Sequence, residues 1–437
     1  MAAARQVAVV GAGVMGLSAA YHLAKAGARP VVFERDRIAG GMAAHFDFDG
    51  LSIERFYHFV CKSDRPTFEL LDEIGLSGAM RWTPTSMGYF YGGAVHRWGD
   101  PFSLLAFPHL SFIEKLRYGL HAFTSTKRSD WRKLDALATD DWVRAWIGER
   151  AFVKLWEPLL RLKFYEYADD VSAAWIWTRI KRVGTSRRNL LQEELGYIDG
   201  GSETLVRRLV ERITALGGEV RLGEGVDEIA LGADGVEGVR VGGRMEPFRQ
   251  AISTAPLPYV PAMIPRLPAQ VAEKLIAQKN IGVVCVLFKL KRSVTPHFWV
   301  NISAPDAAIP GVIEFTRLRP LGDAHVVYAP FYMPQSHPKW RYTDGQFVDE
   351  AFGELRRLNP ALSRADIMAT RVGRLKHAQP LCPPRFLESL PPIAVGVPGL
   401  QICDTSYYYP EDRGVAESTR FGKRMAETAL AGEDGRA

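Results

Sequence analysis

The segment that most constrains the fold is a glycine-rich turn near the start of the chain. Residues 6–10 form a short apolar run, residues 14–26 have the alanine and leucine content of a helix, and residues 30–34 form a second apolar run. This order predicts a strand, a turn, a helix and a second strand, which together make a βαβ unit. Gly11, Gly13 and Gly16 lie in the turn with the spacing GxGxxG.

Each glycine of this turn is required for a different structural reason. The first allows a tight turn, the second lets backbone N–H groups approach a pyrophosphate, and the third lets the helix pack close to the strand. The phosphates then lie at the helix N-terminus, where unpaired N–H groups and the helix dipole favour negative charge. Glu34 ends the second strand 18 residues after Gly16, where a carboxylate accepts hydrogen bonds from ribose hydroxyls and disfavours a 2′-phosphate. The pattern predicts a bound dinucleotide.

The chain after the second strand distinguishes between dinucleotides. It reads RDRIAGGMAAHFDFDG, and the pair Gly40 and Gly41 gives a second place for backbone to lie against a cofactor. This opening resembles that of the flavoprotein family that includes amine oxidases, protoporphyrinogen oxidase and phytoene desaturases. In that family an acid at the end of the second strand is followed by a glycine pair near the flavin. The resemblance implies FAD as the cofactor and a GR2-type, Rossmann-like α/β fold.

Two later patches carry the same resemblance. Residues 200–229 are similar to the family's stretch that brings a backbone contact to adenine. Residues 399–426 are similar to the closing flavin motif, in which an acid faces the ribityl and pyrophosphate region and a final helix begins beneath the flavin ring, its dipole favouring negative charge there. Cys403 departs from the usual glycine, and residues 407–414 form a longer and more polar loop, so no subfamily is assigned. The resemblance gives these FAD-binding residues: Gly11, Gly13, Gly16, Glu34, Arg35, Gly40, Gly41, Met42, Val226, Asp404, Gly414, Val415 and Ala416.

Two kinds of segment alternate along the chain. Residues 82–177 hold eight of the ten tryptophans and predict a mostly helical, aromatic-lined insertion, whereas residues 220–243 alternate like the strands of a meander. Residues 265–385 mix polar loops with apolar runs that indicate a sheet. We therefore expect two discontinuous domains. A Rossmann-like FAD-binding domain of residues 1–80, 196–262 and 386–432 is interleaved with an α+β substrate-binding domain of residues 81–195 and 263–385, which contains the helical, aromatic-rich insertion.

Composition and charge exclude several classes of protein. A chain of 437 residues with 47% hydrophobic and 24% charged residues is typical of globular domains and not of disordered segments. The net charge of +6 is spread along the chain and does not indicate nucleic acid as a partner. The βαβ unit explains the apolar N-terminal run better than a signal peptide does, and no run reaches the length of a membrane-spanning helix. Four separate cysteines with no metal-ligand spacing predict a reducing, cytoplasmic setting and no metal: Cys61, Cys285, Cys382 and Cys403.

Three residues are candidates for catalysis, although in flavoenzymes the cofactor performs most of the chemistry. Arg55 and His58 follow the glycine pair in a stretch expected to return towards the flavin. The unperturbed pKa of histidine is near neutrality, which makes His58 a candidate proton shuttle, and its alternative role is a hydrogen-bonded histidine in an aromatic core. Lys376 falls in a region similar to the family's strand along the flavin, and a solvated surface lysine is its alternative role.

These features predict an FAD-dependent oxidoreductase that removes hydride from, or desaturates, an organic substrate, hydrophobic or ring-containing, held between the domains. A non-catalytic FAD-binding role is one alternative. The other is a redox-neutral mutase similar to UDP-galactopyranose mutase, in which arginines would hold a diphosphate: Arg161, Arg179, Arg182, Arg187 and Arg188.

Residues 100–120 leave the question of a lipid partner open. They combine many apolar residues with Lys115 and Arg117. The segment is either an amphipathic surface that contacts a membrane peripherally or admits a lipid-like substrate, or a core helix with a polar face. The sequence leaves the substrate, the electron acceptor, the oligomeric state and the mode of FAD attachment undetermined.

Overall fold

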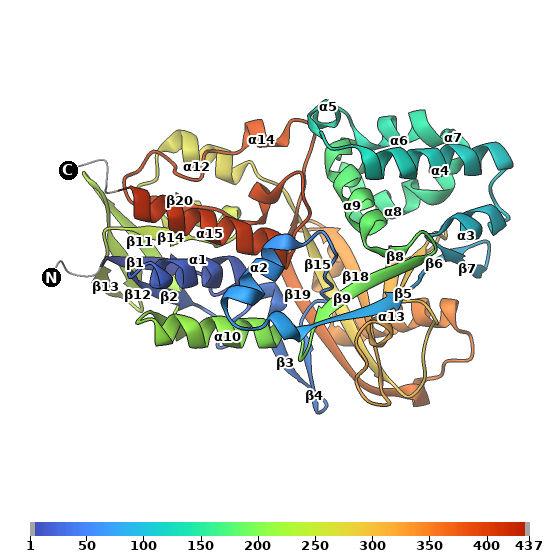
Figure 1. The fold of residues 1–437 in the computed structure, drawn as a ribbon, viewed down its shortest axis with the longest axis horizontal. Helices are drawn as coiled ribbons and strands as arrows, with labels where there is room; N and C mark the ends of the chain where they lie inside the picture. Colours follow the sequence, from blue (N-terminus) through green and yellow to red (C-terminus); the bar gives the residue numbers. More distant parts are fainter. Residues whose placement is uncertain (1–4, 433–437) are drawn as a thin grey trace.

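A parallel five-stranded sheet forms one half of the protein, whose residues 5–432 are described by a computed structural model (Figure 1). Its strand order is β10–β2–β1–β14–β20, and every pairing is parallel. The predicted βαβ unit at the start of the chain is confirmed, with helix α1 (Val14–Lys25) between the first two strands. The five strands are β1 (Gln6–Val10), β2 (Arg29–Glu34), β10 (Glu219–Leu222), β14 (Ala251–Ser253) and β20 (Leu400–Ile402).

Helices α1, α10 (Ser202–Ala215) and α15 (Val415–Ala431) flank this sheet (Figure 1). Helices α1 and α15 pack directly on each other at Gly422. A Cβ at this position would stand 2.4 Å from the carbonyl oxygen of Met15, so only glycine allows the helices to approach this closely. The Ser18 hydroxyl also donates to the Thr419 carbonyl at 3.0 Å. Both helices begin beyond the carboxyl ends of strands, so their positive N-terminal ends point to the same edge of the sheet, where ligands of open α/β sheets bind.

The predicted meander is only partly correct. Strands β11 (Val226–Gly232), β12 (Gly235–Val241) and β13 (Arg244–Pro247) form the expected antiparallel sheet. The segment just before them does not join it, because β10 pairs in parallel with β2. Helix α10 precedes β10 and returns the chain to the open edge of β2, as crossover helices do in parallel sheets.

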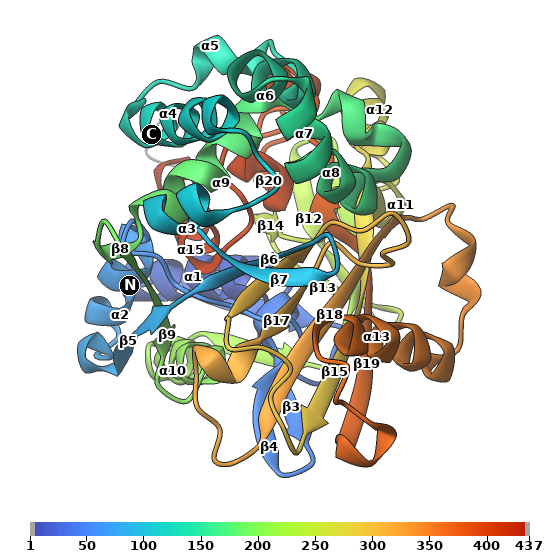
Figure 2. The ribbon, with the colours of Figure 1, turned by 90° about the vertical axis from the view of Figure 1, so that its right-hand side faces the viewer.

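A mixed seven-stranded sheet forms the other half, in the order β19–β15–β18–β17–β16–β6–β7. Its long inner strands are almost entirely buried, and helix α13 (Asp344–Leu358) packs against one face, where the rings of Phe331 and Phe347 are 5.2 Å apart (Figure 2). The strands are β6 (Met87–Tyr91), β7 (Ala94–Trp98), β15 (Asn280–Leu290), β16 (Trp299–Ile302), β17 (Gly311–Glu314), β18 (His325–Pro334) and β19 (Ile367–Pro380).

The aromatic-rich insertion is helical only from residue 101 onward. Before it, β5 (Met80–Thr85), β6 and β7 are strands, and β5 pairs with β9 (Gln192–Ile198), which follows the short β8 (Arg187–Asn189). The helices are α3 (Pro101–Ala106), α4 (Phe112–Lys127), α5 (Arg132–Asp135), α6 (Thr139–Ile147), α7 (Glu149–Leu155), α8 (Glu157–Phe164) and α9 (Ala173–Thr185). Between residues 5 and 432 no helix is both long and apolar enough to cross a membrane.

The two large sheets draw their strands from alternating parts of the chain. The parallel sheet uses residues from 6–34, 219–222, 251–253 and 400–402, whereas the seven-stranded sheet uses 87–98 and 280–380. The boundaries of the two expected domains stay a prediction.

Candidate active site

The glycine-rich turn leaves a small open space at the start of α1. Gly11 has a φ of +102°, and a Cβ at Gly16 would stand only 2.0 Å from the Gly11 carbonyl oxygen, so the turn needs glycine at both positions. At Gly13, by contrast, a Cβ would meet no atom of residues 5–432 within 4 Å, and no side chain in that range caps the helix. The first N–H groups of α1 therefore have no capping side chain among the described residues, which is the arrangement that a helix N-terminus needs to bind a phosphate group.

The second glycine pair lies directly on this turn. The Gly40 N–H donates to the Ala12 carbonyl at 2.7 Å, and a Cβ at Gly41 would stand 3.2 Å from the Gly13 Cα. Both glycines have positive φ, +115° and +59°. Met42 is half-buried in the short turn η1 (Gly41–Ala43) that follows. This segment thus forms the second wall of the space at Gly13.

Glu34 holds the adjoining end of β2 in place. One carboxylate oxygen accepts a hydrogen bond from the Ala12 N–H and the other from the Asp36 N–H, both at 2.8 Å. Arg35 is exposed, and its Cβ lies 3.2 Å from the Cβ position of Gly225, next to the buried Val226. The predicted adenosine residues are therefore brought together beyond the carboxyl end of β2.

The start of α15 forms a second uncapped helix N-terminus. Gly414 is extended, and among the described residues a Cβ there would meet nothing within 4 Å and no side chain caps the helix before Val415 and Ala416. Asp404 is buried nearby, and burial raises the pKa of its carboxyl group. Its two oxygens accept backbone hydrogen bonds from Ser406 at 2.8 Å and Leu257 at 3.0 Å. Asp404 therefore holds the turn before α15, in addition to any contact with a cofactor.

A cluster of charged side chains immediately precedes α15. Asp412 forms an ion pair with Arg179 of α9, and the Arg413 guanidinium donates to the Ala378 carbonyl. Lys163 of α8 has no ion pair with a carboxylate within residues 5–432, and its Nζ lies 4.8 Å from the ring centre of Trp175. Burial, together with the nearby Arg179 charge, lowers the pKa of Lys163 well below its ordinary value. Two guanidinium groups and one carboxylate leave this cluster positive whether or not Lys163 is protonated.

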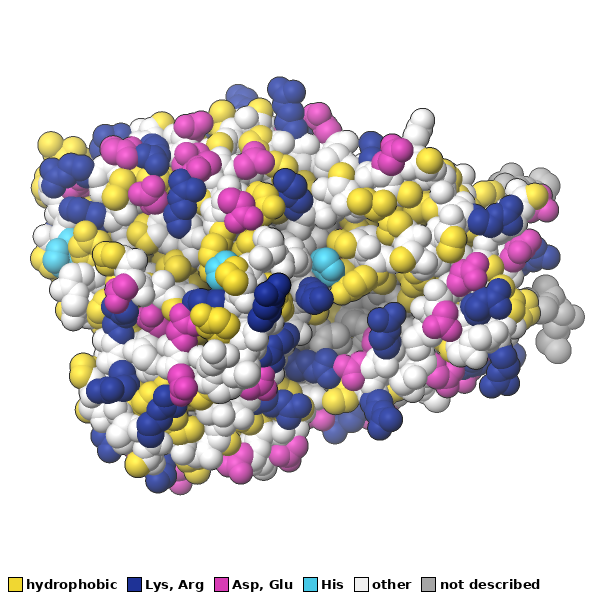
Figure 3. All heavy atoms as spheres, turned by 180° about the vertical axis from the view of Figure 1, so that it is seen from behind, with side chains coloured by type: hydrophobic (Ala, Val, Ile, Leu, Met, Phe, Trp, Pro, Cys, Tyr) yellow, Lys and Arg dark blue, Asp and Glu magenta, His cyan; other side chains and the backbone are white. Residues whose placement is uncertain are grey.

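Aromatic side chains connect this cluster to the seven-stranded sheet. The Tyr57 ring lies 5.3 Å from Trp299 and 5.8 Å from Tyr328. Its hydroxyl is 3.5 Å from that of Tyr332, which is also 3.5 Å from an Arg413 nitrogen. Burial raises the pKa of Tyr57 well above its ordinary value, so the phenol stays neutral. Lys and Arg side chains also border a hollow in the middle of the rear face of the molecule (Figure 3).

The three predicted catalytic residues have different surroundings in the structure. His58 follows Tyr57, and its Nδ1 is buried with no hydrogen-bond partner in the part of the chain that the structure describes. Burial lowers the pKa of His58, which favours the neutral imidazole. Arg55 forms an ion pair with Asp36 at 2.6 Å, which ties it to the loop after β2. Lys376 is exposed on the edge strand β19, so the structure supports its alternative role as a solvated surface lysine.

Sequence reasoning missed most of the charged and aromatic cluster. Lys163, Tyr57, Tyr332 and Arg413 come from four distant segments that only the tertiary structure brings together. One signal was available, since the polar loop 407–414, which departs from the family's usual turn, contains Arg413 and Asp412.

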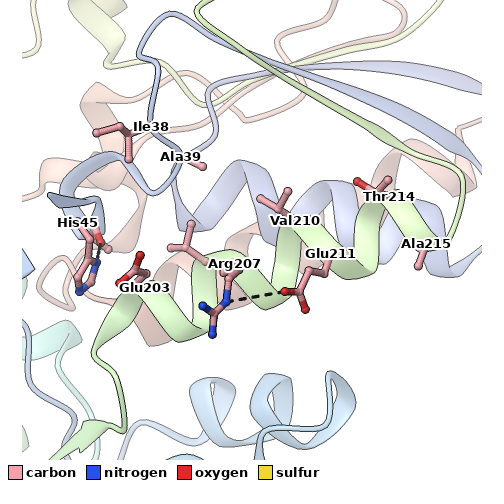
Figure 4. A pocket seen from close by; sticks show the side chains of 11 residues that line it. Ile38, Ala39, His45, Glu203, Arg207, Val210, Glu211, Thr214 and Ala215 are labelled. Atoms are coloured by element: carbon pink, nitrogen blue, oxygen red, sulfur yellow. Dashed lines mark hydrogen bonds and ion pairs between the residues drawn. The ribbon is translucent and has the colours of Figure 1, made fainter. Parts of the chain in front are cut away.

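A groove of about 670 Å³ lies between the loop after β2 and helix α10, next to the segment that contains Gly40 and Gly41 (Figure 4). Apolar side chains from both segments face it, including Ile38, Ala39 and Val210. On its rim, Arg207 and Glu211 form an ion pair at 3.8 Å.

Comparison with known sequences identifies the family. Residues 15–380 match the family model described as flavin containing amine oxidoreductase. A 15-cis-phytoene desaturase from Synechococcus elongatus is 28% identical over 261 residues, which are 54% of each chain. A probable zeta-carotene desaturase from the same species is 27% identical over 251 residues, 51% of each chain. The chain thus spans about half the length of the curated relatives it matches.

Solved structures agree on the fold. A putative protoporphyrinogen oxidase from Exiguobacterium sp. 255-15 superposes with a TM-score of 0.73 at 17% identity, covering 98% of both chains. Cyclohexylamine oxidase from Brevibacterium oxydans IH-35A has a TM-score of 0.73 at 17% identity, covering 100% of both chains. These structures confirm the predicted α/β fold, and the match to the family model confirms the predicted flavin cofactor. The chain belongs to the flavin-containing amine oxidoreductases, and its cofactor is FAD.

Proposed function

We propose that this protein is an FAD-dependent oxidoreductase that removes hydride from, or desaturates, a hydrophobic organic substrate. The observation that carries the proposal is the aromatic and positively charged cluster directly before α15. FAD, when bound, supplies the hydride acceptor. The desaturases among the relatives support the removal of hydrogen from an apolar molecule. Because such a substrate partitions out of water, we propose that the enzyme takes it from an apolar phase.

The two uncapped helix N-termini would hold FAD at either end. We assign the pyrophosphate to the space at Gly13 and the N–H groups of α1, covered by Gly40 and Gly41. Glu34 would accept hydrogen bonds from the ribose hydroxyls, and Val226 would lie at the adenine. The start of α15, from Gly414 to Ala416, would lie beneath the flavin ring, where its dipole favours negative charge.

The chain's own side chains then have distinct tasks. The buried rings of Tyr57, Tyr332 and Trp299 exclude water and orient an apolar substrate. Arg179 and Arg413 keep the local potential positive, which stabilises negative charge that develops at this place. Lys163, whose pKa is lowered, accepts at its Nζ a proton that the substrate loses. His58 is a second neutral base beside the same cluster.

The mutase alternative has less support from the geometry. Three of the arginines expected to hold a diphosphate already have carboxylate partners: Arg161 with Asp169 at 2.8 Å, Arg182 with Asp64 at 2.6 Å, and Arg179 with Asp412. A bound diphosphate would have to displace these carboxylates.

Product analysis tests the proposal. The holoenzyme would be mixed anaerobically, in separate single-turnover reactions, with isoprenoid lipids, polyenes, porphyrinogens, amines and UDP-sugars. The mass of each product would be measured by mass spectrometry. We expect one hydrophobic compound to lose two hydrogens. A product of unchanged mass from a UDP-sugar would instead support the mutase.

Variants of two lysines test the assigned base in the same reactions. Lys163→Met should retain FAD but react slowly, whereas Lys376→Met should react like the wild type because that side chain is exposed. The reverse order of rates would refute the assignment of Lys163.

A further inference from the structure

Helices α3 and α4 present large apolar side chains to solvent. Phe112, Ile113 and Phe102 are 72%, 69% and 66% exposed. On α4 the apolar positions recur with the spacing of one side of a helix. The apolar face, as we call it, consists of Phe102, Leu105, Phe112, Ile113, Leu116, Leu120, Phe123, Leu190 and Leu191, all of which are exposed.

The other side of α4 is firmly packed, so this exposure is not a sign of a loose helix. His121 is buried, with its ring 4.6 Å from that of Trp142. The Trp177 indole N–H donates to the Ser125 carbonyl at 2.9 Å. Helix α4 therefore has one side buried against α6 and α9 and the opposite side apolar and exposed.

Helix α3, helix α4 and the turn after β8 lie near one another in the ribbon (Figures 1 and 2). The Lys115 Nζ donates to the Leu105 carbonyl at 2.6 Å, which joins α4 to α3. Arg187 of β8 donates to the Gly99 carbonyl just before α3. Leu191, in the turn after β8, lines the same depression as Phe102.

The charged residues of α3, α4 and the loop between them are mostly basic. Residues 100–128 contain four lysines and arginines, namely Lys115, Arg117, Lys127 and Arg128. The two acids of this stretch, Asp100 and Glu114, have side chains only 8% and 12% exposed and are engaged in capping boxes at the starts of α3 and α4. The charge that this stretch offers to a partner is therefore positive.

We propose that the apolar face docks on a lipid bilayer with anionic headgroups. Phe112, Ile113 and Leu116 enter the boundary between headgroups and acyl chains, and the basic side chains meet lipid phosphates. A second copy of the chain fits less well, because symmetric pairing of this face would bring like charges together with few exposed acids to oppose them. The inference goes beyond the proposed function, since it concerns a surface remote from the charged cluster and holds whatever the substrate is.

Vesicle co-sedimentation of the holoprotein tests this inference. We expect binding to phosphatidylcholine vesicles that contain phosphatidylglycerol, and weaker binding to phosphatidylcholine alone. The double variant Phe112→Ser, Leu116→Ser should bind the anionic vesicles at least roughly tenfold more weakly. A matched control, Ile276→Ser, removes a side chain that is 66% exposed on another surface and should bind like the wild type.

Three results would overturn the inference. The first is a wild-type protein that binds neither kind of vesicle, and the second is a double variant that binds as well as the wild type. The third is a dimer, seen by analytical ultracentrifugation, that the double variant abolishes, because the apolar face would then belong to a protein interface. FAD content and circular dichroism, measured on each variant, establish that folding is intact. Vesicle binding needs no turnover, so its failure is distinguishable from a failure of the proposed activity.

Discussion

Replacing Gly13 by alanine should weaken FAD binding without unfolding the protein. Gly13 has φ −68° and ψ 170°, which alanine adopts freely, and the added methyl group would meet no protein atom within 4 Å. The free energy of unfolding of the FAD-free protein should therefore change by about 1 kcal/mol or less. The methyl group would stand where the pyrophosphate is proposed to pack. Losing one charge-assisted hydrogen bond there, about 1.5 to 3 kcal/mol, raises the Kd for FAD roughly 10- to 150-fold.

Gly16→Ala provides the contrast. Its methyl group would lie 2.0 Å from the Gly11 carbonyl oxygen, so the turn itself must move, which costs about 1 to 3 kcal/mol of folding stability. The assay is fluorescence titration of FAD into each FAD-free variant, together with urea unfolding of the same samples. A Gly13→Ala protein that binds FAD as tightly as the wild type would refute the placement of the pyrophosphate.

Three further predictions concern stability and rate. Gly422→Ala should lower the free energy of unfolding in urea by about 1 to 3 kcal/mol, because its methyl group would meet the backbone of α1. Gly353→Ala is the control: it lies in the interior of α13, its methyl group would meet no described atom within 4 Å, and it should raise the free energy of unfolding by about 0.5 to 1 kcal/mol. Equal effects of the two substitutions would contradict the packing of α15 on α1. Burial raises the pKa of Glu314 to about 7, so its contribution to wild-type stability is lost as the pH rises from about 4.5 through 7. The free energy of unfolding of Glu314→Gln should therefore rise by up to about 3 kcal/mol relative to that of the wild type as the pH goes from 5 to 8. A difference in free energy between variant and wild type that does not change with pH would contradict this prediction. Lys163→Met removes a buried amine that has no carboxylate partner within residues 5–432 and should leave urea stability unchanged or higher, while anaerobic flavin reduction by substrate slows roughly 100-fold or more; an unaltered rate would exclude Lys163 as the base.

The local parts of the fold could be predicted from the sequence. The turn from Gly11 to Gly16, helix α1 and strand β2 follow from residue spacing within a short segment, and the structure contains all of them. The parallel pairing of β10 with β2 and of β16 with β6 joins segments about 200 residues apart. Such pairings depend on long-range packing, which periodicity along the chain does not report.

The same distinction applies to the site. Glycines and Glu34 could be predicted because a phosphate at a helix N-terminus demands particular residue types at fixed spacing. Lys163 and Arg413 are about 250 residues apart in sequence, and only the packing of α8 and α9 against the loop before α15 places them together. Lys376 has the residue type expected of a site residue, but its strand lies at the edge of the sheet, which leaves the side chain exposed.

The most direct test of the account is the anaerobic visible spectrum of the purified protein, recorded before and after addition of hydrophobic compounds. We predict one FAD per chain, whose oxidised bands are bleached by an isoprenoid, polyene or ring-containing compound and return when an electron acceptor is added. A protein that binds FAD but is bleached by none of these compounds, and that converts a UDP-sugar only after chemical reduction, would contradict the proposed oxidoreductase.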